Sequence, residues 1–263
     1  MVDKATWIGI LLAAGGIVTG LLLEGGNLSQ VLQPTAAMIV FGGTAGAVLI
    51  QFPLAIVLQA VRRLAHVFVE PRLDPQELIT QLVQYANHAR RYGIISLDEE
   101  LNSIQDLFLK KSLMMAVDGM EPQELRKTME LELDNRMEDE EKLFHVFEAA
   151  GGFAPTIGII GAVLGLIQVM QHLDKIDEVG RGIAVAFVAT IYGVGSANLF
   201  FLPAAGKLKI RLRGEQHMRE MVLEGVVSIL EGINPRMLQS KLEGFFAQLQ
   251  HAEEPKEQSA AAS

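Results

Sequence analysis

The sequence predicts an all-α fold, an integral membrane protein with four transmembrane helices and a helical cytoplasmic domain between helices 2 and 3. One observation is that four stretches of at least 18 residues carry no charged side chain, and a helix of that length spans a hydrocarbon core of about 30 Å. They are Thr6–Leu23, Thr35–Val61, Ala149–Gln171 and Ile183–Ala205. The second observation is where the charges gather. Residues 62–148 contain 11 Lys or Arg and 18 Asp or Glu, which supply −7 of the net charge of −9.

The first stretch, Thr6–Leu23, is expected to remain in the protein as a helix. It is longer than the apolar part of a typical signal peptide, and three leucines followed by Glu24 stand where a signal peptidase would need small residues.

Basic residues next to the stretches predict their orientation. Arg62 and Arg63 follow the second stretch, and four more follow the fourth, at Lys207, Lys209, Arg211 and Arg213. In contrast, the loop at residues 24–34 has no Lys or Arg, and the loop at 172–182 has only two. Because basic residues concentrate on the cytoplasmic side of the membrane, we expect both termini and the charged segment in the cytoplasm.

The charged segment is predicted to be helical. Asp74 followed by Pro75 is typical of an N-cap and the first residue of a helix. Gly93 is expected to end that helix. Ser96 and Glu99 have the spacing of a capping box at the start of the next one.

A long helix is expected after the break at Asp118-Gly119, starting near Pro122. Leu125, Met129 and Leu133 recur at a spacing of four. We expect this helix to run on, without interruption, into the third stretch.

The C-terminal part is predicted to contain two further helices. One continues after the fourth stretch through Lys207–Leu230, and a short amphipathic one covers Leu238–Leu249. The polar, Ala- and Ser-rich tail His251–Ser263 is expected to be disordered. The chain then divides into transmembrane helices 1 and 2 (1–61), the cytoplasmic helical domain (62–148), transmembrane helices 3 and 4 (149–205) and a cytoplasmic C-terminal part (206–263).

Small residues mark the third and fourth stretches. Gly158, Gly161 and Gly165 fall on one helix face, and Thr190 shares such a spacing with Gly193. Small residues at these offsets let membrane helices approach each other closely. Composition alone favours a role in helix packing, with the threonine bonded to its own helix.

Composition also excludes several function classes. There is no cysteine, so disulfides and cysteine-based metal sites are impossible. The acidic charge argues against nucleic-acid binding. We found no His, Asp and Glu cluster at metal-ligand spacing, no phosphate loop and no nucleophile motif, so we expect no metal, no cofactor and no enzymatic site. Since none of the four stretches holds an ionisable residue, a protein that moves ions would need the carboxylate of a partner.

Three local strings resemble the MotA/PomA family of flagellar stator proteins, within the wider MotA/TolQ/ExbB group. They are Phe147-Glu148 with Pro155-Thr156-x-Gly158-x-x-Gly161-x-x-x-Gly165-Leu166, Thr190-x-Tyr192-Gly193 with Asn198 and Pro203, and Arg90-Arg91-x-Gly93-x-x-x-Leu97-Asp98-Glu99. The resemblance covers roughly residues 1–250. Each glycine string is weakly specific alone, but the combination is specific.

The resemblance implies a flagellar motor stator subunit of the bacterial cytoplasmic (inner) membrane. Five copies are expected to surround a MotB-type dimer whose span carries an essential Asp, and ion flow past that Asp is expected to generate torque on the rotor protein FliG. The small-residue faces would line the central hole of the pentamer, with the first two helices outside against membrane lipid.

The resemblance also implies roles by position. For the ion pathway and its coupling to movement it indicates Pro155, Ala162, Thr190, Tyr192 and Pro203. For the rotor contact it indicates Arg90, Arg91, Asp98 and Glu99, which composition alone would leave as ordinary surface charges.

Protons are the expected coupling ion. In sodium-type relatives a threonine hydroxyl is implicated at the position of Ala162, which has no oxygen to replace the water around sodium. Thr190 matches a threonine found in both classes and does not discriminate. Alanine is also an ordinary small packing residue, and backbone carbonyls near Pro155 are alternative sodium ligands.

Two other functions stay open at this point. One is a TolQ/ExbB-type energiser of the cell envelope driven by the proton-motive force, although such proteins usually have one span rather than two before the large cytoplasmic region. The other is a membrane scaffold without ion flux. A neighbouring gene for a one-span protein with an Asp in the span and a peptidoglycan-binding domain would favour the stator.

Overall fold

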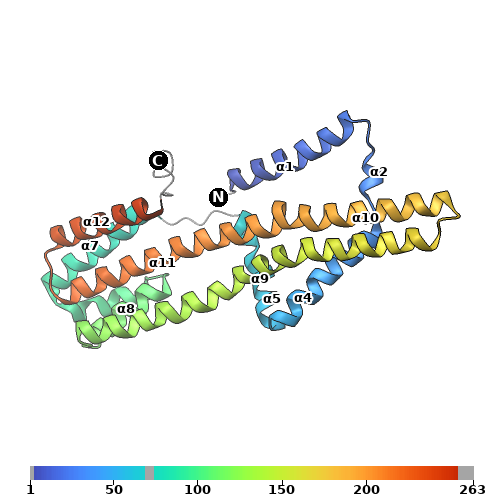
Figure 1. The fold of residues 1–263 in the computed structure, drawn as a ribbon. Helices are drawn as coiled ribbons and strands as arrows, with labels where there is room; N and C mark the ends of the chain where they lie inside the picture. Colours follow the sequence, from blue (N-terminus) through green and yellow to red (C-terminus); the bar gives the residue numbers. More distant parts are fainter. Residues whose placement is uncertain (1–2, 69–73, 254–263) are drawn as a thin grey trace, which may run out of the picture. The chain divides into compact units, whose positions relative to one another are not determined.

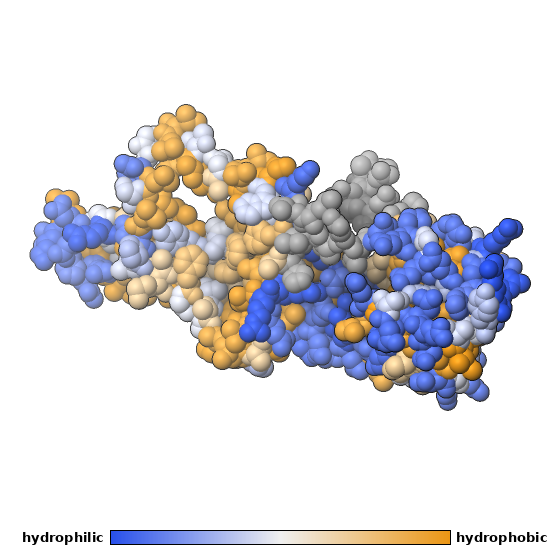
Figure 2. Space-filling view, turned by 180° about the vertical axis from the view of Figure 1, so that it is seen from behind, coloured by the Kyte–Doolittle hydropathy of each residue, from blue (hydrophilic) through white to orange (hydrophobic). Residues whose placement is uncertain are grey.

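The computed structural model describes residues 3–68 and 74–253, and every regular element in these residues is a helix (Figure 1). The chain forms two compact units. The first, here called the membrane unit, comprises Met1–Pro71 and Asp139–Arg211, and the second, here called the polar unit, comprises Arg72–Glu138 and Leu212–Ser263. Apolar side chains gather over the surface of the membrane unit and hydrophilic ones over that of the polar unit (Figure 2).

Among the described residues, four helices are long and apolar enough to cross a membrane, as predicted. They are Lys4–Leu23, Pro34–Gln51 and parts of the two long helical runs Pro122–Gln171 and Ile176–Leu230. A helix satisfies most of its backbone hydrogen bonds internally, which is the requirement that lipid imposes. The first of them, α1 (Lys4–Leu23), has the predicted bounds to within two residues.

The second predicted span, Thr35–Val61, is wrong as a single helix. Helix α3 (Pro34–Ala37), a π-helical turn (Met38–Gly42) and α4 (Gly43–Gln51) end at Phe52, which has an extended backbone with φ −121° and ψ 142°. Pro53 is the cause, because proline disfavours the helical conformation of the residue before it. The chain restarts as the short helices α5 (Leu54–Arg63) and α6 (Ala65–Phe68).

The predicted long helix is confirmed. Helix α9 runs without a break for 50 residues, Pro122–Gln171, and contributes to both units. Helix α10 (Ile176–Ser196) continues through a π-helical turn (Ala197–Phe201) into α11 (Leu202–Leu230), which also contributes to both.

In its described residues, the polar unit adds three α-helices and one 3₁₀ helix to parts of α9 and α11. These are α7 (Pro75–Tyr92), the 3₁₀ helix η2 (Ile94–Asn102), α8 (Leu107–Val117) and α12 (Pro235–Glu253). Their apolar faces share one core, whose largest fully buried members include Leu82, Leu97, Leu113, Leu125 and Met221.

The start of α7 is confirmed, and the start of the following helix is not. The Asp74 carboxylate accepts from the backbone N–H of Gln76 at 3.0 Å, and Gly93 ends α7 with φ 88°. The predicted capping box of Ser96 and Glu99 is wrong. The Ser96 hydroxyl donates to the Gly93 carbonyl at 2.6 Å within the 3₁₀ helix instead.

The true N-cap of α8 is Asp106, whose carboxylate accepts from the Leu109 N–H at 2.7 Å. A 3₁₀ helix has three residues per turn, which brings the Ser96 hydroxyl next to the Gly93 carbonyl three residues earlier. This local hydrogen bond competes with the one that Ser96 would make as an N-cap. At the C-terminal end, α12 covers the predicted Leu238–Leu249 helix. It also includes the first three residues of the tail His251–Ser263, and the rest of that tail lies outside the described residues.

Candidate functional site

Helices α9 and α10 of the membrane unit lie so close together that only glycine fits at their contact points. A Cβ atom at Gly158 would lie 2.8 Å from the Ala189 carbonyl oxygen. One at Gly193 would lie 2.5 Å from the Ala154 carbonyl oxygen, and Gly165 is equally close to backbone atoms of α10. The predicted close approach of two helices through small residues is therefore confirmed.

The expectation that the small-residue faces of these two spans line the central hole of a pentamer stays a prediction, but the glycine face of α9 is already occupied within the chain. The face of Gly158, Gly161 and Gly165 is filled by α10 and the second span of the same chain. The side of α9 that stays exposed carries large apolar residues instead, namely Ile159, Ile160, Val163, Leu164 and Ile167.

Pro155 interrupts the hydrogen-bond ladder of α9. Because proline has no N–H, the Gly151 carbonyl four residues earlier loses its usual donor. Gly151 also packs tightly against the other long helix, since a Cβ there would lie 2.6 Å from a side-chain carbon of Leu202.

Pro203 interrupts the other long helix beside this contact. It is the second residue of α11, after Leu202, which directly follows the π-helical turn Ala197–Phe201. It offers no N–H to the carbonyl of Leu199, which belongs to that turn. The two prolines thus place two weakened points of two long helices side by side, joined by the contact of Gly151 with Leu202.

Thr190 and Ala162 lie near the same part of the α9–α10 contact. The Thr190 hydroxyl donates to the Ala186 carbonyl of its own helix at 3.2 Å. The Cα atom of Thr190 is 3.5 Å from the position of a Cβ on Gly158, and Ala162 follows Gly158 by one helical turn. Both side chains are half-buried.

Tyr192 has a role that the sequence did not suggest. Its hydroxyl donates to the Val31 carbonyl at 2.6 Å and accepts from the Gln33 N–H at 3.3 Å. Its ring lies 5.8 Å from that of Phe41. Tyr192 therefore ties α10 to the start of the second span. The sequence signal for this link is a tyrosine within an uncharged stretch, because a phenol away from water needs a polar partner.

The four residues proposed for the rotor contact are neighbours on the surface of the polar unit. Arg90 and Arg91 lie in the last turn of α7, and Asp98 and Glu99 lie in the 3₁₀ helix that follows Gly93. All four side chains are exposed, and no ion pair or side-chain hydrogen bond is recorded for them within residues 3–68 and 74–253. They offer two positive and two negative charges to a partner.

A buried ion cluster at the start of α1 was missed by sequence reasoning. Asp3 caps α1 by accepting from the Thr6 N–H at 3.0 Å, and it pairs with Lys207 and with Arg211, whose guanidinium lies 2.6 Å away. The hydrogen bond from Lys207 and the one from the Thr6 backbone hold the pKa of Asp3 well below its usual range. An Asp directly before an apolar helix was the available signal.

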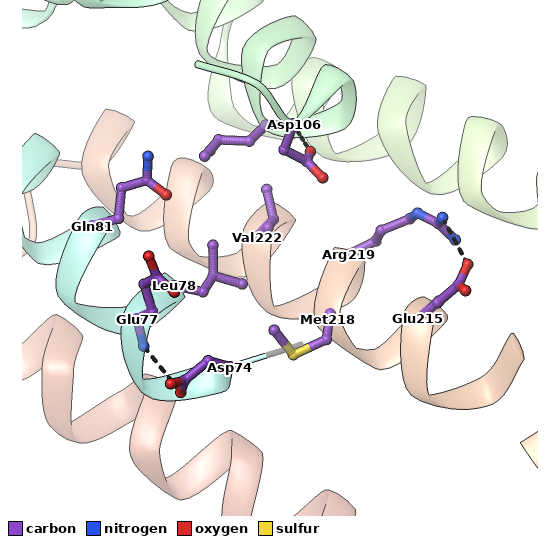
Figure 3. Close-up of a pocket in the computed structure, with 10 residues that line it drawn as sticks. Asp74, Glu77, Leu78, Gln81, Asp106, Glu215, Met218, Arg219 and Val222 are labelled. Atoms are coloured by element: carbon purple, nitrogen blue, oxygen red, sulfur yellow. Dashed lines mark hydrogen bonds and ion pairs between the residues drawn. The ribbon is translucent and has the colours of Figure 1, made fainter. Parts of the chain in front are cut away.

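The polar unit carries an acidic hollow of about 290 Å³ between α7, the start of α8 and α11 (Figure 3). Asp74 and Asp106 point into it while they cap their helices, and Glu215 pairs with Arg219 at 3.3 Å. Among the described residues no group of three or more His, Cys, Asp or Glu is arranged to hold a metal ion. These carboxylates thus have local structural duties.

Comparison with known proteins agrees with this geometry. The family model of the MotA/TolQ/ExbB proton channel family matches residues 100–221, and that of the Motility protein A N-terminal region matches residues 7–93. Motility protein A of Bacillus subtilis is 37% identical over 91% of this chain and 89% of the relative.

Two solved structures are similar along almost the whole chain. MotAB from C. jejuni has a TM-score of 0.87 at 34% identity, covering 92% of this chain and 95% of that one. The flagellar MotAB stator complex from Bacillus subtilis has a TM-score of 0.85 at 36% identity, covering 95% and 100%.

Proposed function

This chain belongs to the MotA/TolQ/ExbB proton channel family, and we propose that it is a stator subunit of the flagellar motor. It is a multi-pass inner-membrane protein that forms an ion channel with a MotB-type partner. The observation that carries this conclusion is the likeness of almost the whole chain to MotAB stator structures. The motility-type N-terminal match, which includes the two spans before the polar unit, favours the stator over a TolQ/ExbB-type energiser.

The uncharged stretches explain why a partner is needed. Ion transfer through a membrane normally uses an ionisable side chain inside it, and none of the four stretches contains one. The carboxylate is supplied by the MotB-type subunit, around whose dimer five copies of this chain assemble. Native mass measurement of the complex in detergent should give five copies of this chain to two of the partner, and monomers or tetramers would contradict this.

Coupling to the rotor uses the two prolines and the continuous helix. Ion transfer at the partner carboxylate shifts α9 and α11 at Pro155 and Pro203, where each ladder of hydrogen bonds is already interrupted. Because α9 is unbroken from Pro122 to Gln171, movement at Pro155 passes along the helix into the polar unit. Arg90, Asp98 and their neighbours then engage FliG through exposed charges, which suit a contact that must form and break repeatedly.

Protons are the coupling ion in this proposal, because Ala162 adds no oxygen near Thr190 to replace the water of sodium. Swimming speed should be unchanged in sodium-free medium and should fall to zero with a protonophore at high sodium. Loss of swimming without sodium, together with insensitivity to the protonophore, would contradict the assignment.

Deletion of the gene tests the main function. Cells should keep assembled flagellar filaments but stop swimming, and the wild-type gene should restore movement. Normal swimming in a strain with no second stator would exclude the stator role. Loss of filaments would indicate a part in assembly instead.

A further inference from the structure

Two large apolar side chains are exposed where α7 ends on the polar unit. Tyr92, the last residue of α7, is 70% exposed, and Ile95, the second residue of the 3₁₀ helix η2, is 72% exposed. Only Gly93 and Ile94 separate them in the chain. The ring of Tyr92 lies 5.1 Å from that of His88, and no hydrogen bond is recorded for the Tyr92 hydroxyl among the described residues.

The geometry of η2 explains why Ile95 stays outside the core. In a 3₁₀ helix, side chains three positions apart share a face. One face turns to the core, because Leu97 is fully buried and Ile94 packs against the same apolar cluster. Ile95 and Asp98 share the next face, and both are exposed. A single helix of this kind cannot turn both faces to the core, so nothing in the polar unit covers Ile95.

The charges around these two side chains distinguish them from other exposed apolar residues. A single exposed apolar residue needs no explanation, since many occur on protein surfaces. Here two positive charges precede the pair in the chain and two negative charges follow it, namely Arg90, Arg91, Asp98 and Glu99. All four are exposed, and no ion pair is recorded for them in the part of the chain that the structure describes. An apolar centre inside a charged rim is typical of a protein–protein contact.

The order of the charges indicates the chemistry of the partner. The arginines lie in the last turn of α7 and the carboxylates lie on η2, so the rim is positive at one end and negative at the other. A lipid head group or a nucleic acid would attract the arginines but repel the carboxylates. A protein surface with an acidic residue, an apolar residue and a basic residue in that order is complementary to the whole patch.

The apolar centre and the charged rim have different effects on such a contact. Exposed ion pairs add little free energy, but they speed the encounter and fix the register of the two surfaces. Side chains that lose their contact with water on binding control how long the complex lasts, and tyrosine is enriched among the residues that carry most of the binding energy. Because only two side chains form the centre, the contact remains reversible.

We propose that Tyr92 and Ile95 form the apolar centre of the rotor contact, and that the rotor protein presents to them an apolar side chain between an acidic and a basic residue. This inference rests on the proposed stator function, and it adds two uncharged residues to a contact so far assigned to charges alone. The charges guide the rotor surface into register, and the apolar centre holds it there while torque is applied.

Photo-crosslinking in cells identifies what touches this patch. A benzophenone amino acid in place of Tyr92 or Ile95, in the full-length chain produced with its MotB-type partner, should give an adduct with FliG. The same amino acid in place of Leu131, which is 62% exposed on the polar unit, should give none. A second copy of the chain or a lipid as the main adduct at both positions would overturn the proposal, and so would the absence of any adduct.

Binding of FliG to the purified full-length complex separates the apolar centre from the charges. Ile95→Ser should weaken binding about tenfold at every salt concentration. The unfolding temperature should stay that of the wild type, because Ile95 is exposed. Arg90→Gln should weaken binding mainly at low salt, since salt screens exposed charges. Ile95→Leu keeps an apolar side chain and should retain most of the binding.

Swimming assays separate this inference from the function on which it rests. Ile95→Ser and Tyr92→Ser should each reduce swimming with a normal amount of protein in the membrane, and Leu131→Ser should not. If both serine variants bind FliG and swim as the wild type does, while reversal of the Arg90 and Asp98 charges stops swimming, the contact is purely ionic and the apolar centre is wrong. Normal swimming after deletion of the gene would instead exclude the stator function itself.

Discussion

The two units of the molecule are stabilised in different ways. Of the twelve largest fully buried side chains in the part of the chain that the structure describes, eleven lie in the polar unit and only Val40 lies in the membrane unit. The hydrophobic effect buries leucine and methionine side chains in the apolar core of the polar unit. In lipid the hydrophobic effect does not drive helices together. The helices of the membrane unit therefore pack through glycine and alanine, and its large apolar residues stay exposed on its surface. A membrane helix can therefore be well packed on one side and unpartnered on the other.

Replacing a packed glycine should have the largest effect on stability. In Gly193→Leu the new side chain would meet the Ala154 backbone, which cannot move away without separating α9 from α10. We expect a loss of more than about 4 kcal/mol, no assembled complex in membranes and no swimming. Thermal unfolding in detergent and swimming assays check this. The matched control is Gly20→Leu on α1, where the space is open, and equal damage from both variants would refute the contrast between the two helices.

Removing a core leucine should have the next largest effect, confined to the polar unit. Leu82 is fully buried and packs against Gly225. Leu82→Ala should destabilise the unit by about 2–5 kcal/mol through lost burial and the cavity left behind. Faster hydrogen exchange in α7 and α12, with α10 unchanged, would reveal it. Leu131→Ala, at an exposed position, is the control and should be nearly neutral.

The sequence was sufficient where local chemistry decides the structure. Absence of charge identified four membrane helices, Asp74 and Gly93 marked the ends of α7, and uninterrupted periodicity predicted α9. The break at Phe52 was missed because the span was predicted from the absence of charge, which says nothing about backbone hydrogen bonds. Pro53 was the signal for the break.

The parts that failed depend on tertiary contacts. Glycine spacing predicted that α9 packs closely, but it could not say that α10 of the same chain is the neighbour. Likewise the link from Tyr192 to Val31 joins residues that are 161 positions apart. The roles of Pro155, Thr190 and the rotor-contact charges rest on family resemblance and stay predictions.

A smaller loss of stability is expected when the ion cluster of the polar unit is broken. This cluster, like the Asp3 cluster of the membrane unit, has one carboxylate paired with two cations. Glu224 pairs with Arg126 at 2.8 Å and with Lys241, and so joins α11 to α9 and α12. Burial raises the pKa of Glu224, but the two cations outweigh it and hold the pKa below its ordinary value.

A lowered pKa means that the unfolded chain binds the proton more tightly, so this stabilisation is present above about pH 4.3 and is lost as the pH falls below it. Glu224→Gln should cost about 1 kcal/mol at pH 7. It should also flatten the loss of stability in acid, as measured by hydrogen exchange in α12. If the variant loses stability in acid as steeply as the wild type, Glu224 does not contribute to the acid sensitivity of the polar unit.

The smallest effect on stability, but a large one on function, is expected from the exposed charges of the polar unit. Arg90 and Asp98 have no recorded partner in the described chain, so Arg90→Glu with Asp98→Lys should change the free energy of unfolding by no more than about 0.5 kcal/mol. If the pair contacts FliG, swimming should be abolished or strongly reduced while the amount of protein in the membrane stays normal. Compensating reversals on FliG should partly restore movement.

The control reverses Lys127 and Glu121, two other exposed and opposite charges of the polar unit, with the same zero change in net charge. Normal swimming by the Arg90 and Asp98 variant, or equal loss in the control, would place the rotor contact elsewhere on the polar unit.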